Sequence, residues 1–206
     1  LVQPREGISL ILMDSQWWMQ HGILSANRKI QRNFLHELEQ LCQEASKRGD
    51  LIFLAAHHPV ISNGKRIHHK QPLRFLLNFS PLKLLSLAGI DRNLKQDMNQ
   101  PRYRRYRHAI RRILQAYPGT ILMAAHDYNM QYLVENQTHH ILSGSGAITR
   151  QIDRYRFPAR FMDDLQPGFF RITIHRSGKV YLHAYGANDR GEYWKSLMFT
   201  HLKTFE

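Results

Sequence analysis

Short apolar runs alternate with amphipathic stretches along the first part of the chain. The apolar runs 7–13, 51–56 and 120–125 have the length of buried strands. Between them, residues 27–48 and 101–116 carry apolar side chains at helical spacing, which predicts two helices. Because a strand, helix, strand succession places consecutive strands side by side in parallel, the pattern predicts an α/β fold with a parallel sheet.

The pattern changes toward the C-terminus. Residues 132–134 and 139–142 predict short strands, and Ser143–Ala147 forms a Gly-Ser-rich segment. No helix clearly starts after that segment, so we interpret it as a tight turn that lets backbones approach, and not as a phosphate-binding loop. From Phe169 to Ala184 apolar and polar residues alternate around Ser177-Gly178, which predicts an antiparallel β-hairpin.

Length and charge narrow the class of protein. The 206 residues correspond to one domain or to part of a larger one, and the net charge of +13 favours anionic partners.

The single cysteine, Cys42, excludes an intramolecular disulfide and lies at an apolar helical position, where a buried thiol is expected. No apolar run has the length of a transmembrane segment. The start at Leu1, without an initiator methionine, is interpreted as a processing site or the edge of an incomplete chain.

The helix predicted at 101–116 carries a dense set of basic residues off its apolar stripe. These are Arg102, Arg104, Arg105, Arg107, Arg111 and Arg112. They form either a solvated face or a surface for an acidic partner. We do not expect nucleic-acid binding, because Tyr103 and Tyr106 lie on the apolar stripe and not among the arginines, as a stacking platform requires. The long irregular stretch 61–100 is expected to be a functional or mobile loop.

Histidines follow two of the predicted strands. The run from Leu51 ends in Ala-Ala-His57-His58-Pro, and the run from Thr120 ends in Ala-Ala-His126. Ligands of open α/β sheets collect at the carboxyl ends of the strands, so both histidines are expected at one site. Each is by itself either a core residue or a metal ligand. Because a catalytic metal needs three or more protein ligands, the residues alone predict half of a metal site.

Four segments carry a resemblance to a known family. They are Leu12-Met-Asp-Ser-Gln-Trp-Trp18, Ala55-Ala-His-His-Pro-Val-Ile-Ser-Asn-Gly64, Ala124-Ala-His-Asp-Tyr-Asn-Met-Gln131 and His140-Ile-Leu-Ser-Gly-Ser-Gly-Ala147. In this order and at compatible spacing, they resemble the calcineurin-like metallophosphoesterases, in particular a bacterial extracytoplasmic branch that shares features with purple acid phosphatases. The resemblance runs from residue 7 to about residue 186. It implies a two-sheet α/β sandwich with flanking helices and a dinuclear metal centre at the strand ends.

The resemblance also implies roles for individual residues. His57 and His126 would bind one metal ion of a dinuclear iron, manganese or zinc centre. His58 would be catalytic, and Asn63 would contact the substrate. The implied reaction is hydrolysis of phosphoric esters, in which metal-activated water attacks phosphorus in line. The implied location is extracytoplasmic, in the bacterial envelope or periplasm or at the cell surface.

The chain also departs from the family pattern. Tyr128 stands where the family has a second ligand histidine, and Ala125 stands where it has a glycine; a phenolate can still bind iron. The family motifs D-x-H, G-D-x-x-D and G-N-H are absent. Residues 1–206 are therefore expected to be the C-terminal part of a single domain, whose other half lies on the same polypeptide or on another chain.

Two functional predictions follow from these departures. The first is a metallophosphoesterase-like domain that hydrolyses phosphoric esters when complete and is degenerate in this chain, with weak or no activity. It would hold a divalent or dinuclear metal centre if active, and otherwise either that centre or no metal. The alternative is a non-catalytic scaffold or binding subunit of a larger envelope-associated assembly, which binds other protein subunits or the missing half through its basic surface.

Overall fold

The computed structural model describes residues 1–21, 27–64, 101–144, 146–153, 156–187 and 193–200. The helices in these residues are α1 (Ser15–His21), α2 (Asn27–Lys47) and α5 (Pro101–Ala116). The strands are β1 (Val2–Arg5), β2 (Ile8–Met13), β3 (Leu51–Ala56), β4 (Ile121–Ala124), β5 (Met130–Glu135), β6 (Thr138–Leu142), β7 (Ala159–Asp163), β8 (Gly168–Ile174), β9 (Val180–Ala187) and β10 (Tyr193–Thr200). From residue 65 onward, the stretch expected to be a functional or mobile loop lies outside the described residues.

Two sheets make up the strand framework. Seven strands form a mixed sheet in the order β1-β2-β3-β4-β6-β5-β7, and β10-β9-β8 form a second sheet. In the first sheet β2, β3, β4 and β6 are parallel, while β1, β5 and β7 run antiparallel to their neighbours. The α/β class with two sheets, flanking helices and the β8–β9 hairpin is the one predicted from the sequence, and it is confirmed.

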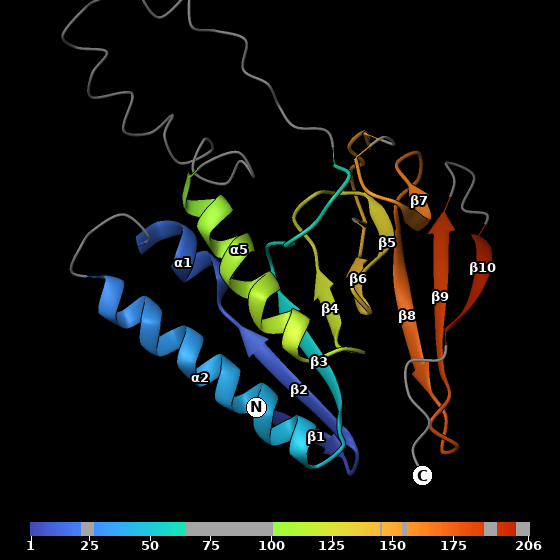
Figure 1. The fold of residues 1–206 in the computed structure, drawn as a ribbon. Coiled ribbons are helices and arrows are strands. Elements are labelled where there is room, and N and C mark those ends of the chain that lie inside the picture. Colours follow the sequence, from blue (N-terminus) through green and yellow to red (C-terminus); the bar gives the residue numbers. More distant parts are fainter. Residues whose placement is uncertain (22–26, 65–100, 145, 154–155, 188–192, 201–206) are drawn as a thin grey trace, which may run out of the picture.

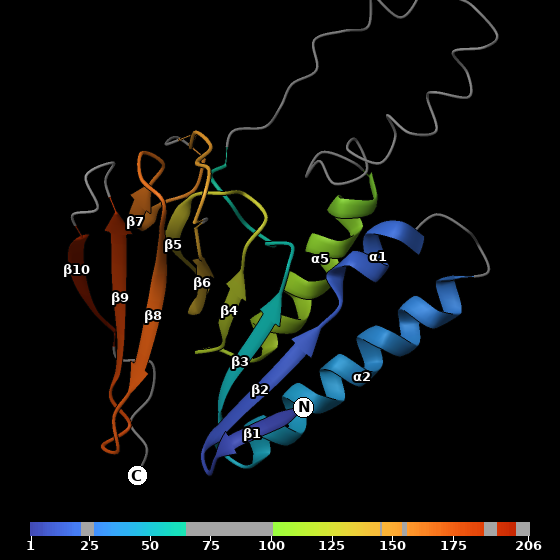
Figure 2. The same ribbon diagram turned by 180° about the vertical axis from the view of Figure 1, so that it is seen from behind.

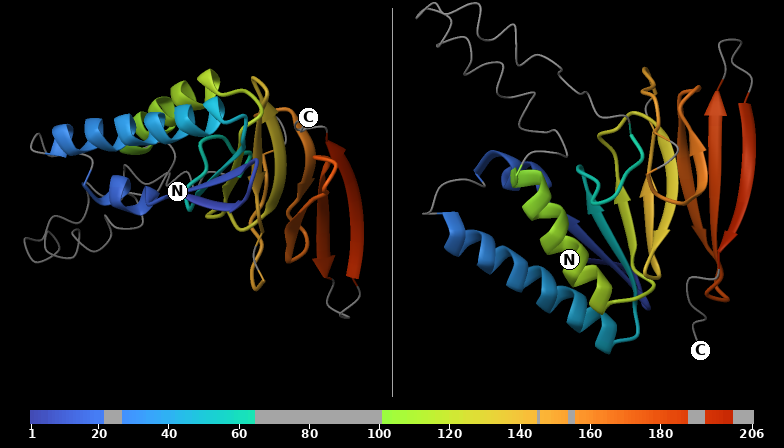
Figure 3. Two further views of the ribbon diagram at one scale, coloured as in Figure 1. Left: turned by 90° about the horizontal axis from the view of Figure 1, so that it is seen from below. Right: turned by 45° about the horizontal axis from the view of Figure 1, so that its top comes forward.

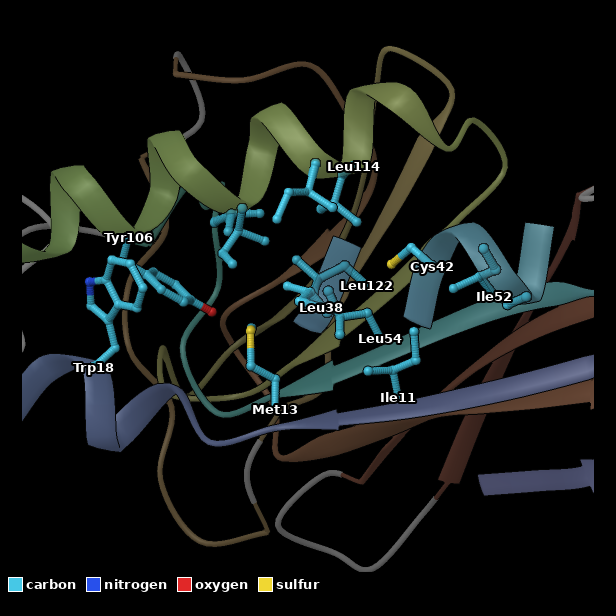
Figure 4. Packing of buried hydrophobic residues seen from close by; sticks show 14 of the residues in the cluster. Ile11, Met13, Trp18, Leu38, Cys42, Ile52, Leu54, Tyr106, Leu114 and Leu122 are labelled. Atoms are coloured by element: carbon cyan, nitrogen blue, oxygen red, sulfur yellow. The ribbon is translucent and has the colours of Figure 1, made fainter. Parts of the chain in front are cut away.

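Helices α2 and α5 cover one face of the seven-stranded sheet, and the three-stranded sheet lies on its other side (Figures 1 and 2). Seen from below, the layers follow one another as helices, first sheet and second sheet (Figure 3). The core beneath the helices joins all three helices to the central strands (Figure 4). Its buried members include Ile11, Leu38, Leu54, Tyr106, Leu122 and Cys42, whose expected burial is confirmed. No helix in the described part of the chain is long and apolar enough to cross a membrane.

A second core fills the space between the two sheets. Along β3, Ile52 and Leu54 belong to the helix-side core, while Leu51 and Phe53 belong to the core between the sheets. This alternation is the period of two that a strand imposes on its side chains. Val180 and Leu182 of the second sheet complete this core. The continuous apolar runs of the sequence therefore reflect central strands that are buried on both faces.

Four elements were not predicted from the sequence: β1, α1, β7 and β10. Helix α1 contains Trp17 and Trp18, and Trp18 packs in the core. Trp18 is buried, with its ring centroid 5.9 Å from that of Phe34 and 6.1 Å from that of Tyr106. Strand β10 pairs with β9 along its whole length. Pairing with a distant segment decides such short strands, and local sequence does not record it.

Candidate metal centre

Two neighbouring strand ends bring His57 and His126 together. β3 and β4 pair directly, with Ala55 opposite Met123, so the residues that follow them leave the sheet at one edge. The backbone N–H of Ala125 donates to the carbonyl of His57 at 3.1 Å and extends the pairing by one step. As a result, His57 Nε2 lies 3.2 Å from His126 Nδ1. The structure thus unites the two histidines that the sequence singled out.

The turn after β4 directs the ring of His126 back toward His57. His126 and Tyr128 have φ angles of 70° and 55°, a left-handed conformation that costs a non-glycine residue about 1 kcal/mol or more. Between them, the N–H of Asp127 donates to the carbonyl of Ala125 at 2.9 Å. The ring centroids of His57 and His126 are 5.1 Å apart. Strain of this kind persists because surrounding contacts hold the turn.

His58 is the third member of the cluster. Its side chain is fully buried, and its ring centroid lies 4.6 Å from that of His126 and 4.8 Å from that of His57. One ligand nitrogen from each of His57, His58 and His126 lies within 4.8 Å of the others, a group that could hold a metal ion. Burial and the two neighbouring imidazoles lower the pKa of His58 to about 3. Its ring is therefore neutral at physiological pH, which is the state that binds metals.

Helix α5 fixes the loop that carries these histidines. Three consecutive carbonyls after β3 each accept a hydrogen bond from an α5 side chain. The bonds run from Tyr106 Oη to His58 O (2.9 Å), from Tyr103 Oη to Pro59 O (2.8 Å) and from Arg107 Nε to Val60 O (2.6 Å). Both tyrosines are fully buried. Helix α5, which packs in the core through its apolar stripe, therefore also supplies the polar contacts that hold the histidine loop, residues 57–60.

Asn63 is fully buried, and both ends of its amide are engaged. Its Nδ2 donates to the carbonyl of Phe157 at 2.8 Å, and its Oδ1 accepts from the N–H of Phe157 at 2.7 Å. Its backbone N–H donates to Gln131 Oε1 at 2.7 Å. Asn63 thus fastens the loop before β7 to the loop after β3. Contact with a substrate stays a prediction, and it would require these bonds to open.

A polar cluster lies directly beside the turn of His126. The hydroxyl of Ser62 donates to Asp127 Oδ2 and accepts from Gln131 Nε2 at 3.1 Å and from the N–H of Gly64 at 2.9 Å. Burial raises the pKa of Asp127, and the Ser62 hydroxyl and the Arg150 cation oppose that rise. The carboxylate next to His126 is therefore used to position the turn, and it is not a member of the three-histidine group.

Tyr128, which stands where the family has a ligand histidine, stacks on a cation. The guanidinium carbon of Arg150 lies 4.6 Å from the centroid of its ring, and the N–H of Arg150 donates to its carbonyl at 2.9 Å. Such a cation–π contact holds the ring to the 146–153 segment. A role of Tyr128 as a metal ligand stays a prediction.

The six arginines of α5 separate into two sets. Arg102 and Arg107 donate to the carbonyls of Met19 and Val60, and Arg111 forms a two-pronged ion pair with Glu135 at 2.8 and 2.7 Å. Those three are partly buried. The exposed set is Arg104, Arg105 and Arg112. The basic surface available to a partner is therefore half of what the sequence indicated.

Ser15 is a residue of the site that sequence reasoning missed. Its Oγ accepts from the backbone N–H of His58 at 3.0 Å and lies 2.9 Å from His58 Nδ1. The signal was present, because Ser15 is the second residue after β2 as His58 is the second residue after β3, and β2 and β3 are parallel neighbours. The strand-end rule that identified the histidines applies equally to Ser15.

Comparisons with known proteins give a fold likeness and no family assignment. The sequence matches no protein-family model and no curated protein. Among solved structures, the chain is similar to GAP50, described as the anchor in the inner membrane complex of Plasmodium, with 16% identity and a TM-score of 0.53. That match covers 92% of this chain and 48% of GAP50, so the chain spans about half of the similar structure.

Two further similarities have lower TM-scores. A dimetal phosphatase from Danio rerio matches with 10% identity and a TM-score of 0.39, over 79% of this chain and 37% of that one. Vps29 from Entamoeba histolytica, complexed with Zn²⁺, matches with 17% identity and a TM-score of 0.31, over 46% of each chain. These two matches, with TM-scores below 0.5, carry no argument, whereas the likeness to GAP50 shows a shared fold.

Proposed function

We propose that the chain is the C-terminal part of a metallophosphoesterase-like domain in which His57 and His126 bind a divalent metal ion. The complete domain would hydrolyse phosphoric esters. The observation that carries the proposal is the pair His57 Nε2 and His126 Nδ1, 3.2 Å apart at adjacent strand ends. The four sequence segments that resemble the family support it. The extracytoplasmic location implied by that resemblance belongs to the same proposal.

The imidazole nitrogens of His57 and His126, at the carboxyl ends of β3 and β4, fit a divalent metal ion. Two imidazole nitrogens that face each other at 3.2 Å share one proton in an N–H···N contact, and a metal ion bound by both replaces that proton. Imidazole is a ligand for zinc, iron and manganese. A bound metal would supply Lewis-acid polarisation of a phosphate oxygen. The chain's own contribution is to hold His57 and His126 just after the ends of β3 and β4, while α5 fixes the loop that follows β3.

We infer that this chain by itself is weakly active or inactive. Tyr128 replaces a ligand histidine of the family and stacks against Arg150. The D-x-H, G-D-x-x-D and G-N-H segments, which would complete a dinuclear centre, do not occur in the sequence. Metal binding and hydrolysis therefore have to be measured separately.

The test compares the purified chain with His126→Ala and with His108→Asn, which removes an exposed α5 histidine away from the cluster. Equilibrium dialysis with Mn²⁺, Fe²⁺ and Zn²⁺ should show binding that His126→Ala abolishes and His108→Asn leaves unchanged. Hydrolysis of p-nitrophenyl phosphate should be slow or undetectable for all three proteins. Metal binding that survives His126→Ala would overturn the proposed site. Turnover that depends on His126 would instead overturn the inference of weak activity.

A second candidate function is a binding subunit that uses its basic surface. Arg104, Arg105 and Arg112 are exposed on a helix without any acidic residue, and His108 lies between them at i, i+4 spacing. The similar fold of GAP50, described as an anchor in a membrane complex, favours this candidate. The partner would then carry a negatively charged surface.

The binding-subunit candidate is tested by chromatography on heparin, a polyanion, and the measured quantity is the salt concentration at which the protein elutes. The variant Arg104→Glu/Arg105→Glu/Arg112→Glu should elute at clearly lower salt than the wild type, since fewer counterions are released on binding. A control with the same change of net charge is Arg28→Glu/Lys29→Glu/Arg32→Glu, at exposed positions of α2. Equal losses in both triple variants would mean that total charge alone governs retention, which contradicts a binding face on α5.

A further inference from the structure

His58 presents one buried atom that the described residues leave without a partner. Its Nε2 has no hydrogen-bond partner among them, although the side chain is fully buried. A buried nitrogen without a partner destabilises the fold, so such an atom needs an explanation. The nearest rings are those of His126 and His57, with centroids 4.6 and 4.8 Å away.

Ser15 is the hydrogen-bond partner of the other ring nitrogen of His58. Ser15 Oγ accepts from the backbone N–H of His58 and lies 2.9 Å from its Nδ1. The hydroxyl of Tyr106 donates to the carbonyl of His58 at 2.9 Å, so the residue is held from two sides.

A metal ion on Nε2 fits one of the two neutral tautomers of His58. In that tautomer Nδ1–H donates to Ser15 Oγ, which also accepts from the backbone N–H of His58. In this arrangement His58 Nε2 carries a lone pair and no proton. A lone pair on a buried neutral imidazole beside two further imidazoles is a metal-ligand position.

We propose that His57, His58 and His126 together form a complete three-histidine site for one zinc ion. This inference rests on the proposed function in placing a metal ion between His57 and His126, and it adds His58 as the third ligand. Three protein ligands with one open position are the arrangement of a catalytic zinc site. The chain could then bind a metal without ligands from a further segment.

The ligand chemistry and the spacing indicate which metal fits. Three imidazoles favour zinc and other late transition metals over magnesium and calcium, which prefer oxygen ligands. Zinc–nitrogen bonds of about 2.0–2.1 Å place tetrahedral ligand nitrogens about 3.4 Å apart. The pair His57 and His126 has 3.2 Å, and all three ligand nitrogens lie within 4.8 Å, so modest ring rotations close the site. The exposed side chain of His57 leaves the site open to solvent on one side.

The experiment measures zinc binding by calorimetry and the visible spectrum of the cobalt-substituted protein. We expect one Zn²⁺ per chain and a cobalt spectrum typical of tetrahedral coordination. The informative variant is His58→Asn, because the asparagine Nδ2 stands in for His58 Nδ1 toward Ser15 while the Nε2 ligand is lost. It should weaken zinc binding at least about 100-fold, more than the loss of an outer-shell partner does. His108→Asn, an exposed position on α5, serves as the matched control and should bind as the wild type does.

The outcomes separate this inference from the proposed function. If His57→Ala and His126→Ala lose zinc while His58→Asn retains wild-type affinity, the three-histidine site is wrong and the two-histidine proposal stands. If the wild type binds no zinc, both are wrong. To separate loss of the ligand from a folding defect in His58→Asn, the wild type is also followed by ¹⁵N NMR of the imidazoles. Three histidines whose ring nitrogens shift on zinc addition support the site, and only two such histidines contradict it.

Discussion

At the scale of single residues, close backbone approach decides where glycine is required. A Cβ added at Gly144 would lie 2.7 Å from the carbonyl oxygen of Gly168 and 2.8 Å from Met130 Cγ. One added at Gly168 would lie 2.5 Å from Met130 Sδ and closer still to the carbonyl of Tyr185. The interpretation of the Ser143–Ala147 segment as a place of close backbone approach therefore holds at Gly144. Both glycines pack around Met130 at the junction of the two sheets.

A pair of substitutions tests this junction. Gly168→Ala should lower the free energy of unfolding by about 2 kcal/mol or more, since the new Cβ meets backbone that cannot move aside. Gly146→Ala is the control, because an added Cβ there meets no atom within 4 Å. It should change stability by less than about 0.5 kcal/mol. Urea denaturation followed by circular dichroism measures both, and equal stability of the two variants would contradict the close approach.

At the scale of elements, helix α5 supports the loop of residues 57–60, which carries His57 and His58. Its buried tyrosines have their rings in the core and donate their hydroxyl protons to the carbonyls of His58 and Pro59. Burial raises the pKa of both tyrosines above their usual value, so both hydroxyls keep the proton that they donate. The helix therefore links the core to the site without contacting a metal.

Removing the hydroxyls of Tyr103 and Tyr106 separates the effect of supporting the loop from the effect of binding the metal ion. Tyr103→Phe and Tyr106→Phe each leave a buried carbonyl unpaired, so each should lower the free energy of unfolding by about 1–3 kcal/mol. Zinc affinity should fall by about 10- to 100-fold, the usual effect of losing a group that positions a ligand. Tyr117→Phe is the control, because its hydroxyl makes an exposed 3.3 Å contact with the Glu39 carbonyl. Unchanged zinc affinity in Tyr106→Phe would show that the loop holds its shape without the helix.

At the scale of the whole molecule, buried histidines connect stability to pH. Burial lowers the pKa of His139 to about 4 and, together with Arg111 and His139, lowers that of His140 to about 3. Both nitrogens of His140 lack a hydrogen-bond partner among the described residues. In the unfolded chain a histidine titrates near pH 6.5, so below that pH the unfolded state binds more protons than the folded state. The stability present at neutral pH is therefore lost as the pH falls from about 6.5 toward 4.

The prediction is a free energy of unfolding that drops by about 2 kcal/mol per buried histidine between pH 7 and pH 5. Urea unfolding in the presence of EDTA, which keeps metal binding out of the comparison, measures the drop. His140→Leu should reduce it by the share of one histidine and should not destabilise the protein at pH 7, because it removes unpaired buried nitrogens. His108→Leu, at an exposed site, should keep the full drop. An unchanged drop in His140→Leu would contradict the buried neutral histidine.

The framework and the histidines at the ends of β3 and β4 were accessible from sequence for a definite reason. Strands buried on both faces need continuous apolar runs, and helices with one buried face need apolar spacing of three and four residues. Those requirements located β2, β3, β4, α2 and α5 closely. They also located the strand ends, and therefore His57 and His126. Short edge elements such as β1 and β7 lacked such a signal, since pairing with distant partners stabilises them.

The sequence by itself determined the α/β class and the nearness of His57 to His126, because strand periodicity and parallel order fix both. It also determined the burial of Cys42, which follows from the apolar spacing of α2. Only the tertiary structure decided the surroundings of His58, which is held by hydrogen bonds with Ser15 and Tyr106, 43 and 48 residues away in the chain. It also decided which arginines of α5 remain exposed. Such contacts join segments distant in sequence, and the free energy of a buried polar group depends on the partners that folding brings to it.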